Sequence, residues 1–184
     1  MTVDSDVWVR VAEPGDAEGL CDLTAAVAAE GRFIVPDRLF FTPEQQARII
    51  AARDPASHQI WVGVADGAVV AEMELVRGTW PKTAHTATLA VVVAAAHRGR
   101  GVFSRCLAAA QDWAEASGVE KLCLTVFATN TEALAAYRRR GFVEEGVRRG
   151  QYRIQGQLVD EVLMARWLER GSLRDVVDRR QHGP

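Results

Sequence analysis

The sequence predicts an α/β domain in which a mixed sheet carries helices on both faces. The centre of the chain alternates β-like runs with helix-like apolar periods, and runs typical of hairpins flank it on both sides. With 184 residues, of which 48% are hydrophobic and 25% charged, the chain has a globular composition and the length of one domain. We therefore expect a single domain over residues 1–168 and a short tail of mixed charge over residues 169–184.

The first part of this domain is expected to contain one strand and two helices. Residues 8–13 alternate like a strand, and the apolar period that follows predicts a helix that ends at Gly31. The run Thr42 to Gln45 reads Thr-Pro-Glu-Gln, a capping box that predicts a second helix to about residue 52. The loop over residues 32–41 is too apolar for a solvated linker, so we expect it to cover another part of the protein.

The centre of the chain predicts a hairpin, a further strand and a long helix. Residues 59–64 and 68–76 form two β-like runs joined at Asp66-Gly67, so they should pair antiparallel. Residues 86–93 predict the next strand, and residues 101–117 place their apolar side chains along one helical stripe.

The last part of the domain predicts one more strand and helix and a final hairpin. Residues 121–127 form the strand, and the run Thr129 to Glu132 has the pattern of a capping box with threonine as the N-cap; a role of Asn130 at the helix start is the alternative. The helix that it opens is expected to end at Gly141. Two more β stretches, residues 142–149 and residues 152–167, complete the sheet.

A basic, glycine-containing turn connects the strand at residues 86–93 to the helix that follows it. Gly99 and Gly101 allow the backbone to turn tightly, and the free N–H groups at the start of the helix carry partial positive charge. Residues 76–111 contain no carboxylate but five cations, which are Arg77, Lys82, Arg98, Arg100 and Arg105. We expect these cations to surround the turn, which has the features of an anion site suited to phosphate groups.

Two motifs occur in a fixed order along the chain. In the first, Arg98, Gly101 and Phe103 are spaced as Arg, two residues, Gly, one residue, Phe. The second runs from Asn130 to Phe142 and reads Asn-Thr-Glu-Ala-Leu-Ala-Ala-Tyr-Arg-Arg-Arg-Gly-Phe. Together they resemble the GNAT superfamily of N-acetyltransferases, although that family prefers glycine or alanine where Phe103 stands. The similarity covers residues 7–168 and looks closest to the amino-acid and phosphinothricin type N-acetyltransferases.

This resemblance implies the GNAT fold, a mostly antiparallel sheet of six to seven strands splayed at its centre, with acetyl-CoA as the acyl donor. In the family the splayed strand holds the pantetheine arm through its backbone, and the glycine turn with the following helix holds the pyrophosphate. The implied cofactor-binding residues are Val91, Val92, Val93, Arg98, Gly99, Arg100, Gly101, Val102, Phe103, Ser104 and Asn130. Tyr137 matches the family's general acid, which protonates the departing CoA thiolate. We expect the ring of Phe103 to point away from the cofactor, into the core.

No motif identifies the general base. Family members often carry a glutamate on the strand before the phosphate turn, but that strand holds no acid here, and Thr88 stands in its place. The candidates are His85 at the start of the strand, Glu72 or Glu74 on the preceding run, or a chain of water molecules. Because side chains alternate along a strand, Glu72 and Glu74 should point to one face.

The expected acceptor is a primary amine of a small molecule, an amino acid or a related compound, which attacks the thioester directly. Arg32, Arg38 and Arg148 are candidate ligands for a carboxylate of that molecule. The alternatives are a protein N-terminal acetyltransferase of the ribosomal-protein type and a non-catalytic acyl-CoA binding module. A dinucleotide-binding oxidoreductase is disfavoured, because the turn lacks the three-glycine fingerprint.

Composition restricts the remaining partners and the location. A net charge of -2 gives no general attraction to nucleic acid or to a membrane surface, and no apolar run reaches the roughly 20 residues that span a bilayer. The three widely spaced cysteines are expected to be reduced and buried, which favours the cytoplasm. The four histidines lack metal-ligand spacing, so we expect no metal site. A homodimer is an expectation from the family alone.

Overall fold

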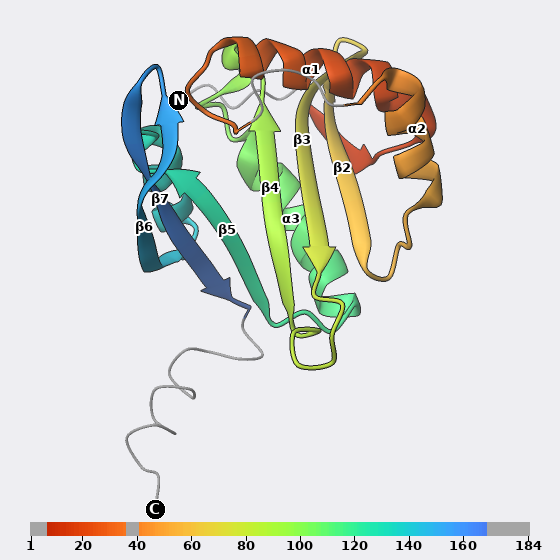
Figure 1. The fold of residues 1–184 in the computed structure, drawn as a ribbon. Coiled ribbons are helices and arrows are strands. Elements are labelled where there is room, and N and C mark those ends of the chain that lie inside the picture. Colours follow the sequence, from red (N-terminus) through yellow and green to blue (C-terminus); the bar gives the residue numbers. More distant parts are fainter. Residues whose placement is uncertain (1–6, 36–40, 169–184) are drawn as a thin grey trace, which may run out of the picture.

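The computed structural model describes residues 7–35 and 41–168, so Arg38 and the tail predicted over residues 169–184 lie outside the described residues. Within the described part, seven strands form one sheet in the order β1-β2-β3-β4-β5-β7-β6 (Figure 1). The strands are β1 (Trp8–Val11), β2 (His58–Ala65), β3 (Ala68–Arg77), β4 (Thr86–Val93), β5 (Lys121–Phe127), β6 (Val143–Ile154) and β7 (Gln157–Trp167). Every neighbouring pair is antiparallel except β4 and β5. The predicted mixed, mostly antiparallel α/β fold is confirmed.

Helices cover both faces of the sheet. They are α1 (Ala17–Ala29), α2 (Pro43–Ala52), α3 (Val102–Ala116) and α4 (Thr131–Arg139), and short 3-10 turns at Pro14–Asp16 and Ala95–His97 precede α1 and α3. On the front face, which is turned to the viewer in Figure 1, α1 and α2 pack on β2 around Leu20, Ile50 and Val62. On the back face, α3 and α4 pack on the larger core, which includes Leu107 and Leu122.

The sheet splits between β4 and β5. These two strands pair over only three positions, where Thr86, Ala87 and Thr88 lie beside Lys121, Leu122 and Cys123. From Leu89 to Val93 the edge of β4 that faces β5 has no strand partner, and Figure 1 shows the two strands diverging toward their upper ends. Apart from the carbonyl of Val93, which accepts Nε of Arg98, the backbone groups that point to this side are therefore free to bind another chain or a ligand. We call this opening the gap; it is the central splay that the family resemblance implied.

Local signals position several elements as predicted. In the capping box of α2, the N–H of Gln45 donates to the side chain of Thr42, and the Gln45 side chain accepts the N–H of Thr42 in return. Asp66 and Gly67 both have positive φ angles, 49° and 79°, as the tight turn between β2 and β3 requires. The bounds of β4 coincide with the predicted residues 86–93.

The start of α4 differs from the prediction. Asn130, not Thr129, is the N-cap, because its side-chain oxygen accepts the N–H of Ala133 at 3.1 Å. Asparagine and threonine are both good N-caps, so residue type alone did not distinguish the two neighbours. The Oδ1 of Asn130 is thus engaged within the chain.

The final hairpin turns later than predicted. A break was expected between residues 149 and 152, but β6 continues through a bulge, and the turn lies at Gln155 and Gly156, whose φ angles are 49° and 83°. Within the bulge, the N–H of Gly150 donates to the carboxylate of Asp160 on β7 at 2.7 Å. This side-chain acceptor satisfies the donor that the bulge leaves unpaired, so the strand does not end there.

Candidate active site

One row of residues crosses the sheet at the level of the gap. Glu72 of β3 lies beside Val92 of β4, and Phe127 of β5 lies beside Glu161 of β7, which in turn lies beside Arg148 of β6. Paired residues on neighbouring strands point to the same face, which here is the front face. When the parallel register of β4 and β5 is continued along both strands, Val92 aligns with Phe127 across the gap. The two halves of the row are therefore at the same level. We call these five residues the cross-strand row.

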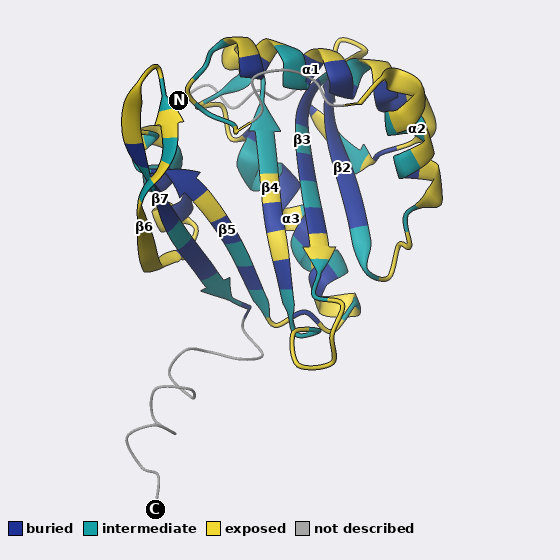
Figure 2. Cartoon of the chain, viewed as in Figure 1, coloured by how far each residue is buried: buried dark blue, intermediate teal, exposed yellow. Residues whose placement is uncertain are grey.

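The front face is uncovered beside this row. Thr88 and Ala90 of β4 and Thr125 of β5 are exposed, although they lie in central strands. Figure 2 shows this exposure in the middle of β4 and β5, while α1 lies across the upper ends of the strands. We call the surface formed by Thr88, Ala90 and Thr125 the open floor; a small molecule can reach the gap across it.

The glycine turn forms an open cradle beside the upper end of the gap. Gly99 and Gly101 have φ angles of 71° and 83°, and a Cβ atom added to either would meet no atom within 4 Å. Gly101 is the N-cap of α3, which no side chain caps. Within the described ranges, the N–H groups of Gly99, Gly101, Val102 and Phe103 have no acceptor. These donors and the dipole of α3 suit a bound phosphate.

Two predicted members of this cradle have other backbone partners. The N–H of Arg98 donates to the carbonyl of Ala95 at 3.4 Å, and the N–H of Ser104 donates to the carbonyl of Gly101 at 3.0 Å. The Arg98 side chain also points away from the turn. Its Nε donates to the carbonyl of Val93, and its two Nη atoms contact both carboxylate oxygens of Glu30 at 2.8 and 2.5 Å. The pKa of Glu30 is lowered, chiefly by this hydrogen bond.

The expectation that five cations surround the turn is therefore wrong. Arg98 is paired with Glu30, and Arg105 donates to the carbonyl of Val7 on the N-terminal side of β1. Arg77 ends β3 at the opposite end of the sheet and donates to the carbonyl of Ala84. A stretch without carboxylates does not keep its cations together, because the partners come from distant parts of the chain.

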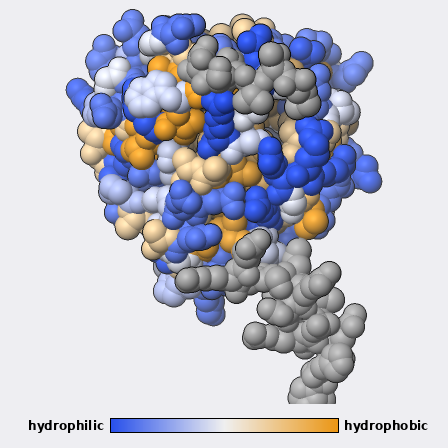
Figure 3. All heavy atoms as spheres, turned by 180° about the vertical axis from the view of Figure 1, so that it is seen from behind, coloured by the Kyte–Doolittle hydropathy of each residue, from blue (hydrophilic) through white to orange (hydrophobic). Residues whose placement is uncertain are grey.

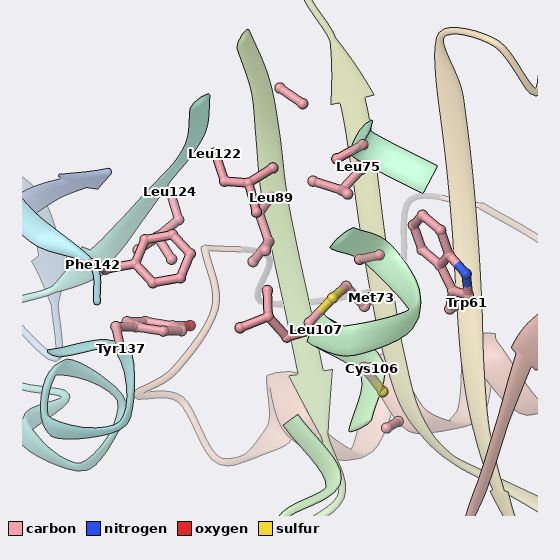
Figure 4. Packing of buried hydrophobic residues seen from close by; sticks show 14 of the residues in the cluster. Trp61, Met73, Leu75, Leu89, Cys106, Leu107, Leu122, Leu124, Tyr137 and Phe142 are labelled. Carbon is pink, nitrogen blue, oxygen red and sulfur yellow. The ribbon is translucent and has the colours of Figure 1, made fainter. Parts of the chain in front are cut away.

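Tyr137 of α4 lies on the back face of the gap. Its ring sits between Phe103 and Phe142, at centroid distances of 5.3 and 5.8 Å. Figure 4 shows the hydroxyl directed away from α4, toward Leu107 and β4. Burial raises the pKa of Tyr137 to about 12, so the phenol stays protonated near neutral pH. Its hydroxyl makes no hydrogen bond to another residue in the described part of the chain, which leaves it available to a ligand.

This arrangement of a splayed sheet, an open glycine cradle and a buried tyrosine has a counterpart among known proteins. The model of the acetyltransferase (GNAT) family matches residues 25–142. The chain belongs to this family. The resemblance drawn from the two motifs and the prediction of an acyltransferase enzyme are both confirmed. No curated protein matches the chain.

Solved GNAT structures share the fold over most of the chain. An acetyltransferase of this family from Streptococcus pneumoniae has a TM-score of 0.80 at 25% identity, over 88% of this chain and 99% of its own. A GCN5-related N-acetyltransferase from Kribbella flavida has a TM-score of 0.77 at 26% identity, over 89% and 98%. A phosphinothricin acetyltransferase from Sinorhizobium meliloti, solved in complex with acetyl-CoA, has a TM-score of 0.80 at 15% identity, over 91% of each chain. At that identity the likeness shows the fold alone.

Phe103, the departure from the GNAT phosphate motif, is accommodated by the back-face core. It lies in the first turn of α3, and its partly buried ring packs against the core next to Tyr137. The two rings meet edge to face, with an interplanar angle of 76°. A large side chain is tolerated here because it packs against α4, while the N–H of the same residue still faces the cradle.

The structure does not bring His85 to the gap. Its ring stacks on Trp167 at 6.3 Å, and its carbonyl accepts the N–H groups of Glu120 and Lys121 at the closed end of the β4–β5 pair. Val92 lies seven positions after His85 along the strand, which is about 23 Å at 3.3 Å per residue.

Glu72 and Glu74 share the front face of β3, as the alternation predicted, but their surroundings differ. Oε1 of Glu74 lies 2.6 Å from Nε2 of His58 on β2 and so has a partner. Glu72 belongs to the cross-strand row at the gap. Burial, together with the smaller effect of the charge of Glu74, raises the pKa of Glu72 to about 7. Of the three side-chain candidates for the base, Glu72 is the one held at the gap with a pKa near neutrality.

Arg148, a predicted carboxylate ligand, is joined to Tyr152 by a residue that no sequence motif indicated. Glu161 is 3% exposed; its Oε1 accepts the Tyr152 hydroxyl at 2.5 Å, and its Oε2 accepts Nη1 of Arg148 at 2.7 Å. The Tyr152 ring lies against Phe127 at 4.8 Å. Burial acts to raise the pKa of Glu161, but hydrogen bonds from Tyr152, Thr125 and Arg148 outweigh it and lower that pKa. The sequence signal for such a residue was a glutamate within the apolar run of β7, because a buried acid needs hydrogen-bond partners.

The loop after α1 and the tip of the β6–β7 hairpin meet above the gap (Figure 1). A Cβ atom at Gly31 would lie 3.9 Å from the side-chain nitrogen of Gln155. Arg32 is 67% exposed and lies over the Phe33 ring at 4.5 Å, and the guanidinium of Arg98 covers that ring at 4.4 Å. The apolar loop thus packs over another part of the protein, as far as it is described.

Other predicted properties have only partial tests. Within the described ranges no helix is long and apolar enough to cross a membrane, and no three His, Cys, Asp or Glu side chains gather as a possible metal site.

Cys21, Cys106 and Cys123 are free, the first two buried, and burial raises the pKa of each thiol. From behind, hydrophilic side chains are interspersed with small hydrophobic groups (Figure 3). The cytoplasmic location, the homodimer and the lack of a metal stay predictions.

Proposed function

We propose that this GNAT protein transfers the acetyl group of acetyl-CoA to the primary amine of a small molecule, an amino acid or a related compound. The observation that carries the proposal is the gap. It connects the glycine cradle and Tyr137 on the back face with Glu72 and the open floor on the front face. A donor and an acceptor that enter from opposite faces would meet between β4 and β5.

The residues present fit acetyl-CoA on the donor side. The open space at Gly99 and Gly101 and the free N–H groups at the start of α3 suit the pyrophosphate. The unpaired edge of β4, which includes Val91, Val92 and Val93, offers backbone groups other than the Val93 carbonyl to the pantetheine arm. The side-chain nitrogen of Asn130 is a further donor nearby, because only Oδ1 is used in capping α4. When bound, acetyl-CoA supplies an activated thioester.

Tyr137 and Glu72 suit the two proton transfers of the reaction. Direct attack forms a nitrogen–carbon bond, breaks the carbon–sulfur bond and releases one proton from the amine. Glu72, ionised above its pKa of about 7, accepts that proton at its carboxylate. Tyr137 donates its phenolic proton to the leaving sulfur from the back face; its pKa of about 12 keeps that proton in place until charge develops.

The test is thiol release from acetyl-CoA with a panel of amino acids, polyamines, aminoglycosides and N-terminal peptides. We expect amine-dependent release with at least one amino acid or a close relative. Calorimetric titration with CoA runs in parallel. A protein that binds CoA but acetylates no amine would contradict the proposal and favour a non-catalytic acyl-CoA binding module.

A further inference from the structure

We infer that Arg148, held in place by Glu161, binds the carboxylate of an α-amino acid acceptor and selects for it. The inference rests on the proposed function and names the substrate class of the same site. It assigns a specificity role to the β6–β7 hairpin, from residues that lie in the cross-strand row and outside both GNAT motifs.

The guanidinium of Arg148 has an unused binding edge. Nη1 donates to Glu161, while Nε and Nη2 make no hydrogen bond to any other residue in the described part of the chain. These two nitrogens form the side of the guanidinium that binds a carboxylate with two parallel hydrogen bonds. The Arg148 side chain is 55% exposed, so a ligand on the front face can reach this edge.

Glu161 holds the guanidinium of Arg148 in a fixed position before a ligand binds. It is buried and has one oxygen on Tyr152 and the other on Arg148, so its own position is fixed from two sides. Tyr152 is positioned in turn by its contact with Phe127, on the strand that borders the gap. A guanidinium oriented in advance loses less side-chain freedom when it binds a carboxylate.

The cross-strand row also places opposite charges on the two sides of the gap. Glu72 lies on the β3 side, while Arg148 is held over β7, one strand beyond β5. In an α-amino acid the nitrogen and the carboxylate oxygens are only about 3 Å apart, by standard bond lengths. Paired strands lie about 4.8 Å apart, so such a molecule with its nitrogen in the gap directs its carboxylate over β5 toward Arg148, and Glu72 lies on the side of its amine.

The charges around Arg148 disfavour other acceptors. Arg149, next along β6, is 84% exposed and pairs with Asp160, so it adds no uncompensated charge beside Arg148. A polyamine has no carboxylate for the Arg148 edge and would bring an ammonium group next to its guanidinium. The N-terminus of a peptide presents a neutral carbonyl where a free amino acid presents a carboxylate, so it would leave the Arg148 edge without an ionic partner.

The experiment compares free amino acids with their carboxamides, which keep the side chain and lack the carboxylate charge; the less basic amine of the amide works against the expected preference for the acid. Thiol release is measured for twenty L-amino acids, each beside its amide, with a dipeptide and a polyamine as further arms. For the native chain we expect kcat/KM for the best acid to exceed that for its amide by about 10- to 100-fold, the range of one charged hydrogen-bonding contact. Arg148→Ala should lower kcat/KM for the acid to the kcat/KM for its amide.

The matched control is Arg149→Ala, which removes a neighbouring cation outside the row and should keep the preference for the acid. Arg148→Lys retains the charge without the planar edge, so this variant should keep only part of the preference for the acid. A second readout avoids turnover: the acid is titrated calorimetrically into the enzyme saturated with CoA. Arg148→Ala should weaken its binding at least tenfold.

Three outcomes would overturn the inference while acetyl transfer itself stands. They are amides that react as well as acids, an Arg148→Ala variant that loses acid and amide activity equally, and a peptide that reacts better than any free amino acid. Failure of the proposed function looks different, because then the native chain acetylates no amine in the panel although it binds CoA.

Discussion

Phe103 and Tyr137 meet edge to face, with ring centroids 5.3 Å apart, and so connect the first turn of α3 to α4. The same turn carries free N–H groups of the cradle, and Tyr137 is the proposed acid. One aromatic contact thus joins the part of the site that would hold the pyrophosphate to the part that would donate a proton. Edge-to-face pairs contribute about 0.5–1.5 kcal/mol beyond the area that they bury.

We expect Phe103→Ala to lower kcat by about 10- to 100-fold, because Tyr137 loses one of the two rings that orient it. The N–H of residue 103 remains, so the dissociation constant of CoA should change by about threefold or less. Single-turnover kinetics and calorimetry measure the two quantities. Phe103→Leu, which keeps apolar bulk, should recover part of kcat; equal losses in both variants would mean that ring contact is unimportant.

Tyr137→Phe is expected to reduce kcat by about 100-fold or more, the usual range for losing a general acid. The phenyl ring keeps the contacts with Phe103 and Phe142, so CoA affinity and melting temperature should stay close to those of the native chain. The measurement is single-turnover acetyl transfer, in which product release does not limit the rate. Native-like turnover in this assay would remove Tyr137 from the proposed chemistry.

Glu72 should give the pH dependence of acetyl transfer. Because its pKa is raised to about 7, kcat/KM should increase with pH through that value as the base ionises, and Glu72→Gln should abolish this limb and slow the reaction about 100-fold. Glu74→Gln is the matched control. It removes the neighbouring charge that raises the pKa of Glu72, so the limb should move to lower pH.

The same residue makes a stability prediction. The carboxyl of Glu72 binds its proton more tightly in the folded chain than in the unfolded chain, where the pKa is near 4.5. Its contribution to the free energy of unfolding is therefore fully present below pH 4.5 and is lost as pH rises through about 7. Relative to the native chain, Glu72→Gln should become steadily more stable between these two values. Thermal unfolding across that range measures the difference, and a difference that does not vary with pH would argue against burial as the cause.

Arg98 should contribute to stability more than to phosphate binding, since its guanidinium pairs with Glu30 and Val93. Arg98→Ala and Glu30→Ala should each lower the free energy of unfolding by about 1–3 kcal/mol, and the double variant should lose less than the sum. Denaturant unfolding of all four proteins gives the coupling. The pKa of Glu30 is lowered, so this stabilisation is present above its ordinary value of 4.5 and is lost on acidification. Additive losses would show that the pair does not act as a unit.

Elements with local signals were predictable almost to the residue. The capping box of α2 needs only Thr42 and Gln45, and the bounds of β4 follow from an uncharged run between two turns. Two elements differed from the prediction for different reasons. Asn130, not its neighbour Thr129, is the N-cap of α4. At Gly150 a side chain from β7 accepts the backbone N–H, and no pattern within β6 reveals that hydrogen bond.

The site was predictable only where a motif contains it. Tyr137 and the glycine turn come from runs whose spacing along the chain is itself the signal. Arg98 was expected at the phosphate because it lies in the motif, but Glu30, 68 residues earlier, takes its side chain. An ion pair forms with whatever opposite charge the fold brings near, and separation along the chain says little about that.

The sequence by itself determined the order of helices and strands, the glycine turn, the position of Tyr137 and hence the family. These features depend on periodicity, capping and spacing within short runs, which the chain carries locally. Only the tertiary structure decided that Glu72 is the carboxylate at the gap and that Glu161 holds Arg148 on the same row. The row joins five strands, and its alignment depends on the register of each neighbouring pair. A shift of one residue in any pair would turn these side chains to the other face.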